Sequence, residues 1–289
     1  MKKTAYIILT VLVIINIISW SFLFSTKDNL LKVIFFDVGQ GDGIFIETLD
    51  KKQIVIDGGP DYNLMAEKIS EELPFWDKEI DAIILTHTDS DHMNGLLGVL
   101  EKYKVDNILW TGVKKEGMEK KIENWENIVN KEVENNGAKV FLVKNTNTIL
   151  TSNMSLNFLW PEKINEKINS NDSNDYSLAS RLCYLKTCFL FMGDMSFNEE
   201  KNVIRDEDIK GDILKVAHHG SKYATSNEFI SAVSPKLAII EVGKNSYGHP
   251  ALETIKRLED YGAKVVRTDT QGDITVFSDG QDYKIVYEK

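Results

Sequence analysis

The chain is short of the residues on which several classes of protein depend. Only two cysteines and five histidines occur among its 289 residues. Two cysteines exclude a scaffold held by several disulfides, and they exclude a cysteine-rich structural zinc site. Basic residues are also in deficit, with 34 Lys and Arg against 44 Asp and Glu, which gives a formal net charge of -10. A broadly basic nucleic-acid-binding surface is therefore disfavoured, although a local basic groove is not.

One uncharged apolar run, Ala5–Phe24, stands near the start of the chain and follows Lys2 and Lys3. Its length approaches the ~20 residues that span a bilayer and exceeds the ~7–15 of a typical signal-peptide core. We predict that residues 1–28 form an uncleaved signal-anchor. The alternatives are a cleaved signal peptide and a buried core helix. The two lysines keep the N-terminus inside, which places residues 29–289 outside the cell, held at the cell membrane by a single span or secreted.

Short apolar strands alternate with helices in the rest of the chain. Ile80–Leu85 is a continuous apolar run typical of a buried strand, and Ile213–Val216 also indicates a strand. Gly95–Lys102 and Pro250–Tyr261 have helical patterns. Two mixed sheets flanked by helices fit this order better than one doubly wound parallel sheet. No internal repeat or linker interrupts residues 29–289, so we expect them to form one domain.

The histidines gather at predicted strand ends and helix starts, and the densest group is His87-Thr88-Asp89-Ser90-Asp91-His92. His87 and Asp89 point the same way on an extended chain, because side chains alternate with period two. Asp91 and His92 open the next helix and can face a second point. A polar loop with a capping aspartate would need only one such residue. The group therefore predicts a site for one or two adjacent divalent ions.

The same residues resemble the His-x-His-x-Asp-His signature of the metallo-β-lactamase superfamily, with Asp89 in the second His position. Six further motifs occur in the order found in the extracellular metallo-hydrolase domain of the ComEC competence proteins. They are Asp37–Asp42, Asn174-x-x-Ser177, Gly193-Asp194, His218–Ser221, Tyr247–Pro250 and Arg267-Thr268-Asp269-x-x-Gly272. The series covers Leu31 to the C-terminus. The many-helix channel part of ComEC has no counterpart, so we expect a stand-alone relative.

The resemblance implies an α/β fold, the four-layer αββα sandwich of the metallo-β-lactamases, with a metal site at one edge between two sheets. Asp194 takes the place of the carboxylate that bridges two ions. Only one of His218 and His219 should be a ligand, because neighbours on an extended chain point oppositely. We favour His218, which leaves His219 to orient it or to act in catalysis. His249 precedes Pro250 at a predicted helix start, where the helix dipole favours neutral, metal-binding imidazole.

Several other residues are expected to hold these ligands or to contact substrate. Asp57 should hold the loop between His87 and His92. The remaining members of this group are Asp37, Asp42, Asn174 and Ser221. No histidine lies between His92 and His218, so the site is richer in oxygen than the superfamily pattern. Oxygen ligands favour Mn²⁺ and leave Zn²⁺ open.

We predict a hydrolase in which a metal-activated water attacks the substrate and Asp91 binds metal and orients that water. The resemblance points to a phosphodiester, above all nucleic acid, and so to a nuclease of DNA uptake. A hydrolase of small esters, lactones or cyclic diesters would share every motif. A non-catalytic DNA-uptake accessory would keep the fold without turnover. A β-lactamase follows from fold analogy alone, which does not fix a substrate.

The two cysteines flank a predicted hairpin whose two-residue loop is Leu185-Lys186. In that register Cys183 faces Cys188 at a Cα separation of ~4.5 Å, near the ~4.4–6.8 Å range of disulfides. An exterior location would permit oxidation. Two reduced cysteines remain the alternative, because the loop lacks the Asn-Gly chemistry that fixes a hairpin register.

Overall fold

The computed structural model describes residues 6, 10–16, 30–143, 148–151, 153–162, 169–170, 173–205 and 209–289. Contacts divide the chain into two units, Met1–Leu30 and Leu31–Lys289. In the first unit residues 10–16 are helical and exposed. Most of the apolar run Ala5–Phe24 lies outside the described residues. Among the helices that are described, none combines the length and apolar content needed to cross a bilayer.

The first sheet of the second unit has eight strands in the order β17-β16-β1-β2-β3-β4-β5-β7. Strands β16, β17, β1, β2 and β3 pair antiparallel, and β3, β4, β5 and β7 pair parallel. The strands are β1 (Leu31–Phe35), β2 (Ile44–Glu47), β3 (Gln53–Ile56), β4 (Glu79–Ile84), β5 (Lys104–Trp110), β7 (Lys139–Leu142), β16 (Ile274–Ser278) and β17 (Tyr283–Tyr287).

The second sheet has seven strands in the order β15-β14-β13-β12-β11-β9-β8. It is parallel from β12 to β15 and antiparallel from β8 to β12, so both sheets are mixed, as predicted. Its strands are β8 (Thr148–Thr151), β9 (Met154–Trp160), β11 (Ala179–Tyr184), β12 (Thr187–Phe191), β13 (Ile213–Lys215), β14 (Leu237–Ile240) and β15 (Lys264–Arg267). A separate short pair joins β6 (Lys114–Lys115) to β10 (Asn169–Ser170).

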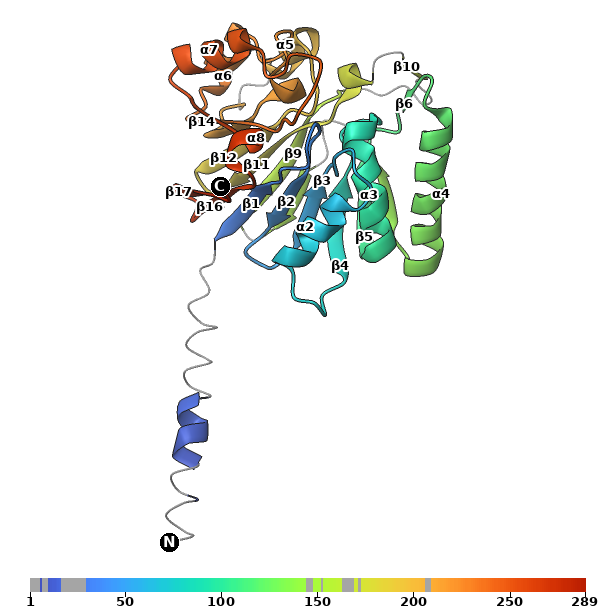
Figure 1. Ribbon diagram of the computed structural model, residues 1–289, viewed down its shortest axis with the longest axis vertical. Coiled ribbons are helices and arrows are strands. Elements are labelled where there is room, and N and C mark those ends of the chain that lie inside the picture. The colour runs from blue at the N-terminus through green and yellow to red at the C-terminus, as the bar shows by residue number, and fades with distance from the viewer. Residues whose placement is uncertain are drawn as a thin grey trace. The chain divides into compact units, whose positions relative to one another are not determined.

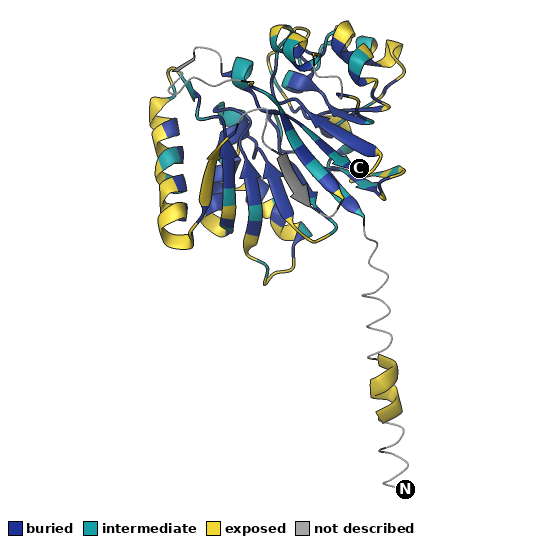
Figure 2. Cartoon of the chain, turned by 180° about the vertical axis from the view of Figure 1, so that it is seen from behind, coloured by how far each residue is buried: buried dark blue, intermediate teal, exposed yellow. Residues whose placement is uncertain are grey.

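Helices cover the outer face of each sheet, as Figure 1 shows. On the first sheet lie α2 (Leu64–Glu72), α3 (Ser90–Lys102) and α4 (Glu119–Asn136). On the second lie α5 (Phe197–Val203), α6 (Asn227–Val233) and α7 (Leu252–Asp260), and the short α8 (Thr268–Gln271) follows β15. One apolar core lies between the two sheets, and a further core lies beneath each helical layer. Figure 2 shows the resulting pattern, in which most strands are buried, the edge strand β7 is exposed, and the helices are exposed on their outer faces. The predicted αββα sandwich is confirmed.

The central core is built from side chains that alternate inward along facing strands. Phe35 of β1 and Phe191 of β12 meet across the sheets with ring centroids 6.2 Å apart. Phe189, two residues from Phe191, stacks beside it at 6.2 Å. Both sheets are therefore fixed against each other near the strand ends that carry the polar residues described below.

Two helices begin at other residues than their helical patterns predict. Helix α3 starts at Ser90, before the Gly95 at which the apolar helical pattern begins. This agrees with the expectation that Asp91 and His92 open the helix, and Asp89 is extended at the N-cap position. Ser90 and Asp91, which follow Asp89 in the first turn, suit the positively polarised N-terminus of a helix. Helix α7 starts at Leu252 rather than Pro250, because Ala251 is still extended. Consequently His249 lies before the helix and not at its N-terminus.

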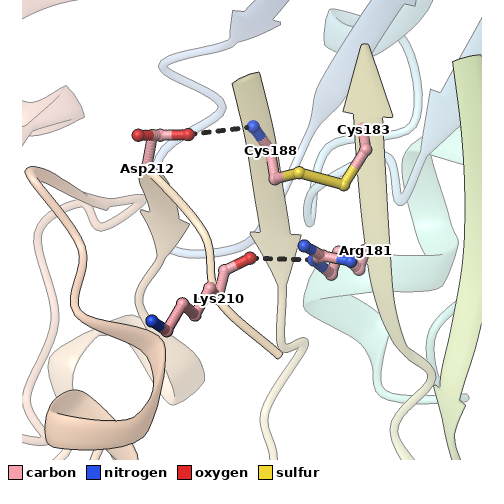
Figure 3. The surroundings of a disulfide bond; sticks show 5 residues. All are labelled: Arg181, Cys183, Cys188, Lys210 and Asp212. Carbon is pink, nitrogen blue, oxygen red and sulfur yellow. Dashed lines mark hydrogen bonds between the residues drawn. A yellow bond between two sulfur atoms is a disulfide. The ribbon is translucent and has the colours of Figure 1, made fainter. Parts of the chain in front are cut away.

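The hairpin β11–β12 has the predicted register, with Tyr184 opposite Thr187 and Cys183 opposite Cys188. The two cysteines form a disulfide with a Cα–Cα distance of 4.2 Å, so the reduced alternative is not the one that the structure contains (Figure 3). Asp212 accepts a hydrogen bond from the backbone N–H of Cys188 at 3.1 Å. The bridge thus sits at the loop end of the hairpin.

Candidate metal centre

The polar residues converge on one edge of the sandwich, just beyond the carboxyl ends of parallel strands. His87 lies three residues after β4, Asp194 three residues after β12, and His218 three residues after β13. Such strand ends are the usual place for sites in open α/β sheets. His87, His219 and Asp194 are almost fully buried, at 2%, 2% and 3% exposure. Charged groups this deep need partners or a cation.

The loop from β4 to α3 is fixed by Asp57, which follows β3. Its carboxylate accepts the backbone N–H of Thr86 at 2.8 Å and the Thr86 hydroxyl at 2.6 Å. His92 Nδ1 donates to the same carboxylate at 2.8 Å. His87 Nδ1 lies 3.0 Å from the Thr86 hydroxyl oxygen. Asp57 therefore orients both histidines through one side chain, and their Nε2 atoms stay available for a ligand.

Close backbone approach brings α3 against the strand ends. A Cβ on Gly58 would meet the backbone N of Leu96 at 2.3 Å, and one on Gly95 would meet the Gly58 oxygen at 1.9 Å. Only glycines permit this contact. This close contact brings the His92 imidazole within hydrogen-bond distance of the Asp57 carboxylate.

Asp194 lies between the histidines of the two halves of the domain. Its Oδ1 is 3.4 Å from His92 Nε2, and its Oδ2 is 3.5 Å from His219 Nε2 and 3.7 Å from His218 Nε2. The Ser177 hydroxyl accepts the Asp194 backbone N–H at 3.1 Å. The two carboxylate oxygens thus face different imidazoles, which is the arrangement that a bridging ligand needs.

His218 and His219 do not continue an extended strand, as the sequence argument assumed. Both have left-handed backbone angles, with φ 51° each, inside the 3₁₀ turn η2 (Ala217–Gly220). His219 turns inward, donates through Nδ1 to the Glu241 carbonyl at 2.9 Å, and has Nε2 3.6 Å from Asp91 Oδ2. The His218 side chain is 33% exposed. The geometry therefore favours His219 over His218 as a ligand.

Unsatisfied buried atoms test whether a cation fits. Four polar atoms of the described site have no hydrogen-bond partner although they are buried: His87 Nε2, His92 Nε2, His219 Nε2 and Asp194 Oδ1. Buried polar atoms without partners are rare and costly. Among the described residues, His87, His92 and Asp194 form one group whose ligand atoms lie within 4.8 Å of one another, and Asp91, His92 and His219 form another. The residues present fit a divalent ion.

The charges of this cluster depend on one another. Burial opposes ionisation of Asp194, but His219, His92 and His218 hold its pKa well below the usual value. Burial also opposes protonation of His219, yet Asp194, Asp42 and Asp91 raise its pKa to about 10. Burial lowers the pKa of His87, aided by His92. In the absence of a cation, protons on imidazole balance the carboxylates, and a bound cation would replace them.

Asp89 has partners that the sequence did not suggest. Lys115 of β6 and Ser173 both hydrogen-bond to its carboxylate. His87 Nε2 lies 4.0 Å from Asp89 Oδ1. Each carboxylate oxygen has a second lone pair, so these contacts leave Asp89 able to coordinate.

His249 lies at the rim of the centre. It is partly buried, and its Nδ1 donates to the His218 carbonyl at 3.1 Å. Burial lowers its pKa, and so do His218 and His219. None of the ligand groups found among the described residues, which include a third formed by Asp42, Asp57 and His92, contains His249. Its role as a ligand, expected from sequence, stays a prediction.

A buried charge cluster beneath the histidines escaped the sequence analysis. Lys215 of β13 is 1% exposed and pairs with the carboxylate of Asp42. Asp42 also lies 3.3 Å from His219 Nδ1 and 3.7 Å from His92 Nδ1. Glu241, 1% exposed, accepts the Gly43 backbone N–H at 2.9 Å. The sequence did contain a signal for this cluster: Lys215 and Glu241 are single charged residues within otherwise apolar runs, which indicates buried charges.

The loop that carries Asp42 passes directly against the first ligand loop. The Asp42 backbone N–H donates to the Asp91 carbonyl at 3.3 Å. Gly41, with φ 151°, has no space for a side chain, since a Cβ there would lie 2.3 Å from the same carbonyl. The loop after β1 therefore packs tightly against the loop that carries Asp91.

The other three expected residues lie further out. Asp37 pairs with Lys289 at 3.1 Å. Asn174 begins the 3₁₀ turn η1 (Asn174–Tyr176), next to the Ser173 that holds Asp89. Ser221 is buried, and its carbonyl accepts the Thr254 hydroxyl at 2.9 Å. The Ser221 backbone N–H donates to the His218 carbonyl at 2.8 Å, and Asp37 belongs to none of the ligand groups found among the described residues.

Part of the chain matches a known family model, and most of it is similar to named proteins. Residues 36–128 match the family model described as Metallo-beta-lactamase superfamily. The chain is 29% identical over 265 residues to ComE operon protein 3 of Bacillus subtilis, covering 84% of this chain and 32% of that protein. It is 25% identical over 251 residues to Competence protein ComA of Neisseria gonorrhoeae, covering 86% and 32% respectively. The chain thus spans about a third of the length of these relatives.

Among solved structures, the metallo-beta-lactamase fold protein YhfI from Bacillus subtilis is similar, with a TM-score of 0.57 and 12% identity. The likeness covers 86% of this chain and 100% of YhfI. At that identity it shows the fold alone.

Proposed function

We propose that this metallo-beta-lactamase domain is a metal-dependent phosphodiesterase. The observation that carries the proposal is the set of four unpartnered buried atoms, three imidazole nitrogens and one carboxylate oxygen, that meet around Asp194. Imidazole and carboxylate together suit Zn²⁺ and Mn²⁺. We assign one or two such ions to the centre.

His87, Asp89 and Asp194 would hold one ion, and Asp91, His92 and His219 would hold the other, with Asp194 shared. Bound there, a divalent ion lowers the pKa of a coordinated water and polarises the scissile group. Asp91, at the start of α3, orients the attacking water. Asp57 and Asp42 keep the imidazoles of His92 and His219 in place.

His218 and His249 have a different place in this proposal. Both lie at the more open side of the centre, where the His218 Nε2 is 3.7 Å from Asp194. An imidazole there would contact the phosphate of a substrate through a ring N–H. We therefore assign His218 to the substrate, and we keep His249 as a further candidate ligand.

The substrate proposal rests on the relatives. One relative is Competence protein ComA, and a relative that serves competence supports DNA or another nucleic acid as the substrate. The net charge of -10 is the observation that favours the second candidate, a small phosphodiester or cyclic diester that needs no extended basic surface. A role in DNA uptake without turnover is the third.

Location follows a separate line of support. We propose that residues 1–28 anchor the protein and that the domain lies outside the cell, anchored or released. The Cys183–Cys188 disulfide supports this, because disulfides persist in oxidising compartments. Protease added to intact cells should degrade the domain. In untreated cells, the anchored protein should sediment with the membranes. Survival of the domain under protease would contradict an exterior location.

The activity is tested with the purified full-length chain. We expect at least one divalent ion per chain by elemental analysis after reconstitution with Zn²⁺ or Mn²⁺, and hydrolysis of one among DNA, RNA and a small phosphodiester. Asp91→Asn should lose turnover but keep more of the metal than loss of an imidazole would. Asp260→Asn, an exposed residue on α7, is the matched control. Metal binding without turnover of any diester would favour the accessory role.

A further inference from the structure

A pocket of about 410 Å³ opens beside the rim of the metal centre, at the start of α7. Its walls include Lys222, Tyr223, Tyr247, His249 and Glu253. His249 connects the pocket to the centre, because its Nδ1 contacts the His218 carbonyl and His218 Nε2 lies 3.7 Å from Asp194. A substrate whose phosphate lies at the centre would therefore present its neighbouring group to this pocket.

Two tyrosines of the pocket are unusually exposed for aromatic residues. Tyr247 is 75% exposed and Tyr223 is 65% exposed. The Tyr247 ring centroid lies 6.0 Å from that of His249. Exposed tyrosines beside a site supply rigid, amphipathic contact area at low entropic cost.

The loop that carries Tyr247 is held in one conformation. Asn245 Oδ1 accepts the backbone N–H groups of Tyr247, Gly248 and His249 at 3.0 to 3.1 Å. Asn245 Nδ2 donates to the carbonyls of Gly243 and His249 at 2.9 and 2.8 Å. The exposed ring is thus presented from a fixed backbone, which lowers the entropic cost of binding a flat ligand.

The charges of the pocket indicate which part of a substrate enters it. Lys222 and Glu253 both line it, so it carries no excess of positive charge. The Lys222 ammonium lies 4.9 Å over the Tyr223 ring and is engaged there. A second phosphate would meet the Glu253 carboxylate as well as the Lys222 ammonium, so the two charges together offer it no net attraction. An uncharged flat group suits these walls better.

We infer that this pocket takes a nucleobase of the substrate, stacked on Tyr247, while the adjacent phosphate lies at the metal centre. The inference rests on the proposed phosphodiesterase function and narrows its substrate to nucleotides. Stacking on an aromatic ring is tolerant of base identity, so cleavage should depend on the presence of a base and little on its sequence.

The test compares two strands of equal length, an oligothymidylate and its abasic tetrahydrofuran analogue, with the metal-loaded full-length chain. The wild type should have a KM about tenfold lower for the thymidine strand, within the range of one stacked base. Tyr247→Ala should bring the ratio of the two KM values close to one, and Tyr247→Phe should restore most of it. Tyr261→Ala, an exposed tyrosine just after α7, should leave the ratio unchanged.

A dinucleotide arm distinguishes the sources of the base. A KM as low as that of the strand indicates a small nucleotide substrate, and a much higher KM indicates a polynucleotide; both keep the base in the pocket. If the wild type cleaves both strands with equal KM, or Tyr247→Ala keeps the ratio, the inference is wrong and the phosphodiesterase stands. If no diester is cleaved, the proposed function fails, and strand binding by fluorescence anisotropy, compared between the same variants, still decides the pocket.

Discussion

The two halves of the domain supply the metal centre in different ways. The first half presents His87, Asp89, Asp91 and His92 from one loop, held by Asp57 at the end of the next strand. The second half presents Asp194 and His219 from two separate loops, and His249 lies on a third loop at the rim. In this half the support is a buried ion pair between Lys215 and Asp42, which joins strand β13 of one sheet to the loop after β1 of the other.

This difference separates local from long-range control of the site. One loop carries the first set, and hydrogen bonds from Asp57, Lys115 and Ser173 fix it, so its geometry depends on few residues. The second set depends on the two sheets meeting correctly, and the Lys215–Asp42 pair marks that junction. Changes in the first half should therefore affect metal binding directly, and changes in the second half should affect stability as well.

The largest effect is expected for His92→Ala. His92 belongs to all three of the ligand groups found among the described residues, and its loss removes an imidazole ligand and leaves Asp57 without its imidazole partner. Hydrolysis should fall by about 10²–10³ or more, by analogy with other positioned catalytic groups, and metal content should fall with it. His249→Ala, at the rim, should retain more metal. Metal content is measured by elemental analysis. Equal metal loss in both variants would contradict the claim that the first half controls metal binding more directly than the second.

Lys215→Met tests the second half. The change leaves Asp42 buried without its cation, which typically costs about 3–5 kcal/mol of unfolding free energy. Lys236→Met is the matched control, because Lys236 pairs with Asp212 but is 71% exposed, and such surface pairs contribute little. Urea unfolding of the wild type, Lys215→Met and Lys236→Met measures the change in unfolding free energy for each variant. A Lys215→Met chain as stable as the wild type would show that the junction does not depend on this pair.

The smallest effect is expected for the disulfide. Replacing Cys183 and Cys188 together by serine opens a loop of six residues, for which the chain-entropy relation gives about 2 kcal/mol. Metal content should not change, since the bridge lies at the hairpin loop, away from the Asp194 end of β12. Thermal unfolding and elemental analysis check the two statements. Loss of metal in the double variant would mean that the hairpin positions Asp194.

The sequence predicted the first half of the centre better than the second, for a physical reason. The spacing from His87 to His92 is local, so alternation along the loop and the start of α3 are sufficient to bring these side chains together. The two mixed sheets also followed from the order of strands and helices. The hairpin register of Cys183 and Cys188 followed from loop length.

The remainder depends on tertiary contacts that the sequence does not encode locally. The turn at His218 and His219 is left-handed, so the alternation rule selected the wrong member of the pair for the inward position. Helix α7 begins after Pro250 because Ala251 is extended. Lys215 finds Asp42 across 173 residues of sequence, and no local pattern links them.

The central claim is that Asp194 joins both halves by binding metal between them. The direct measurement is metal content and phosphodiester hydrolysis of Asp194→Asn beside the wild type and Asp260→Asn. The amide keeps the shape but removes a charge and one anionic oxygen. We expect the variant to fold, to lose metal, and to lose about 10²–10³ or more in rate, with no recovery on added Mn²⁺ or Zn²⁺. A wild-type chain that binds no divalent ion, or an Asp194→Asn chain with near-full activity, would contradict the account.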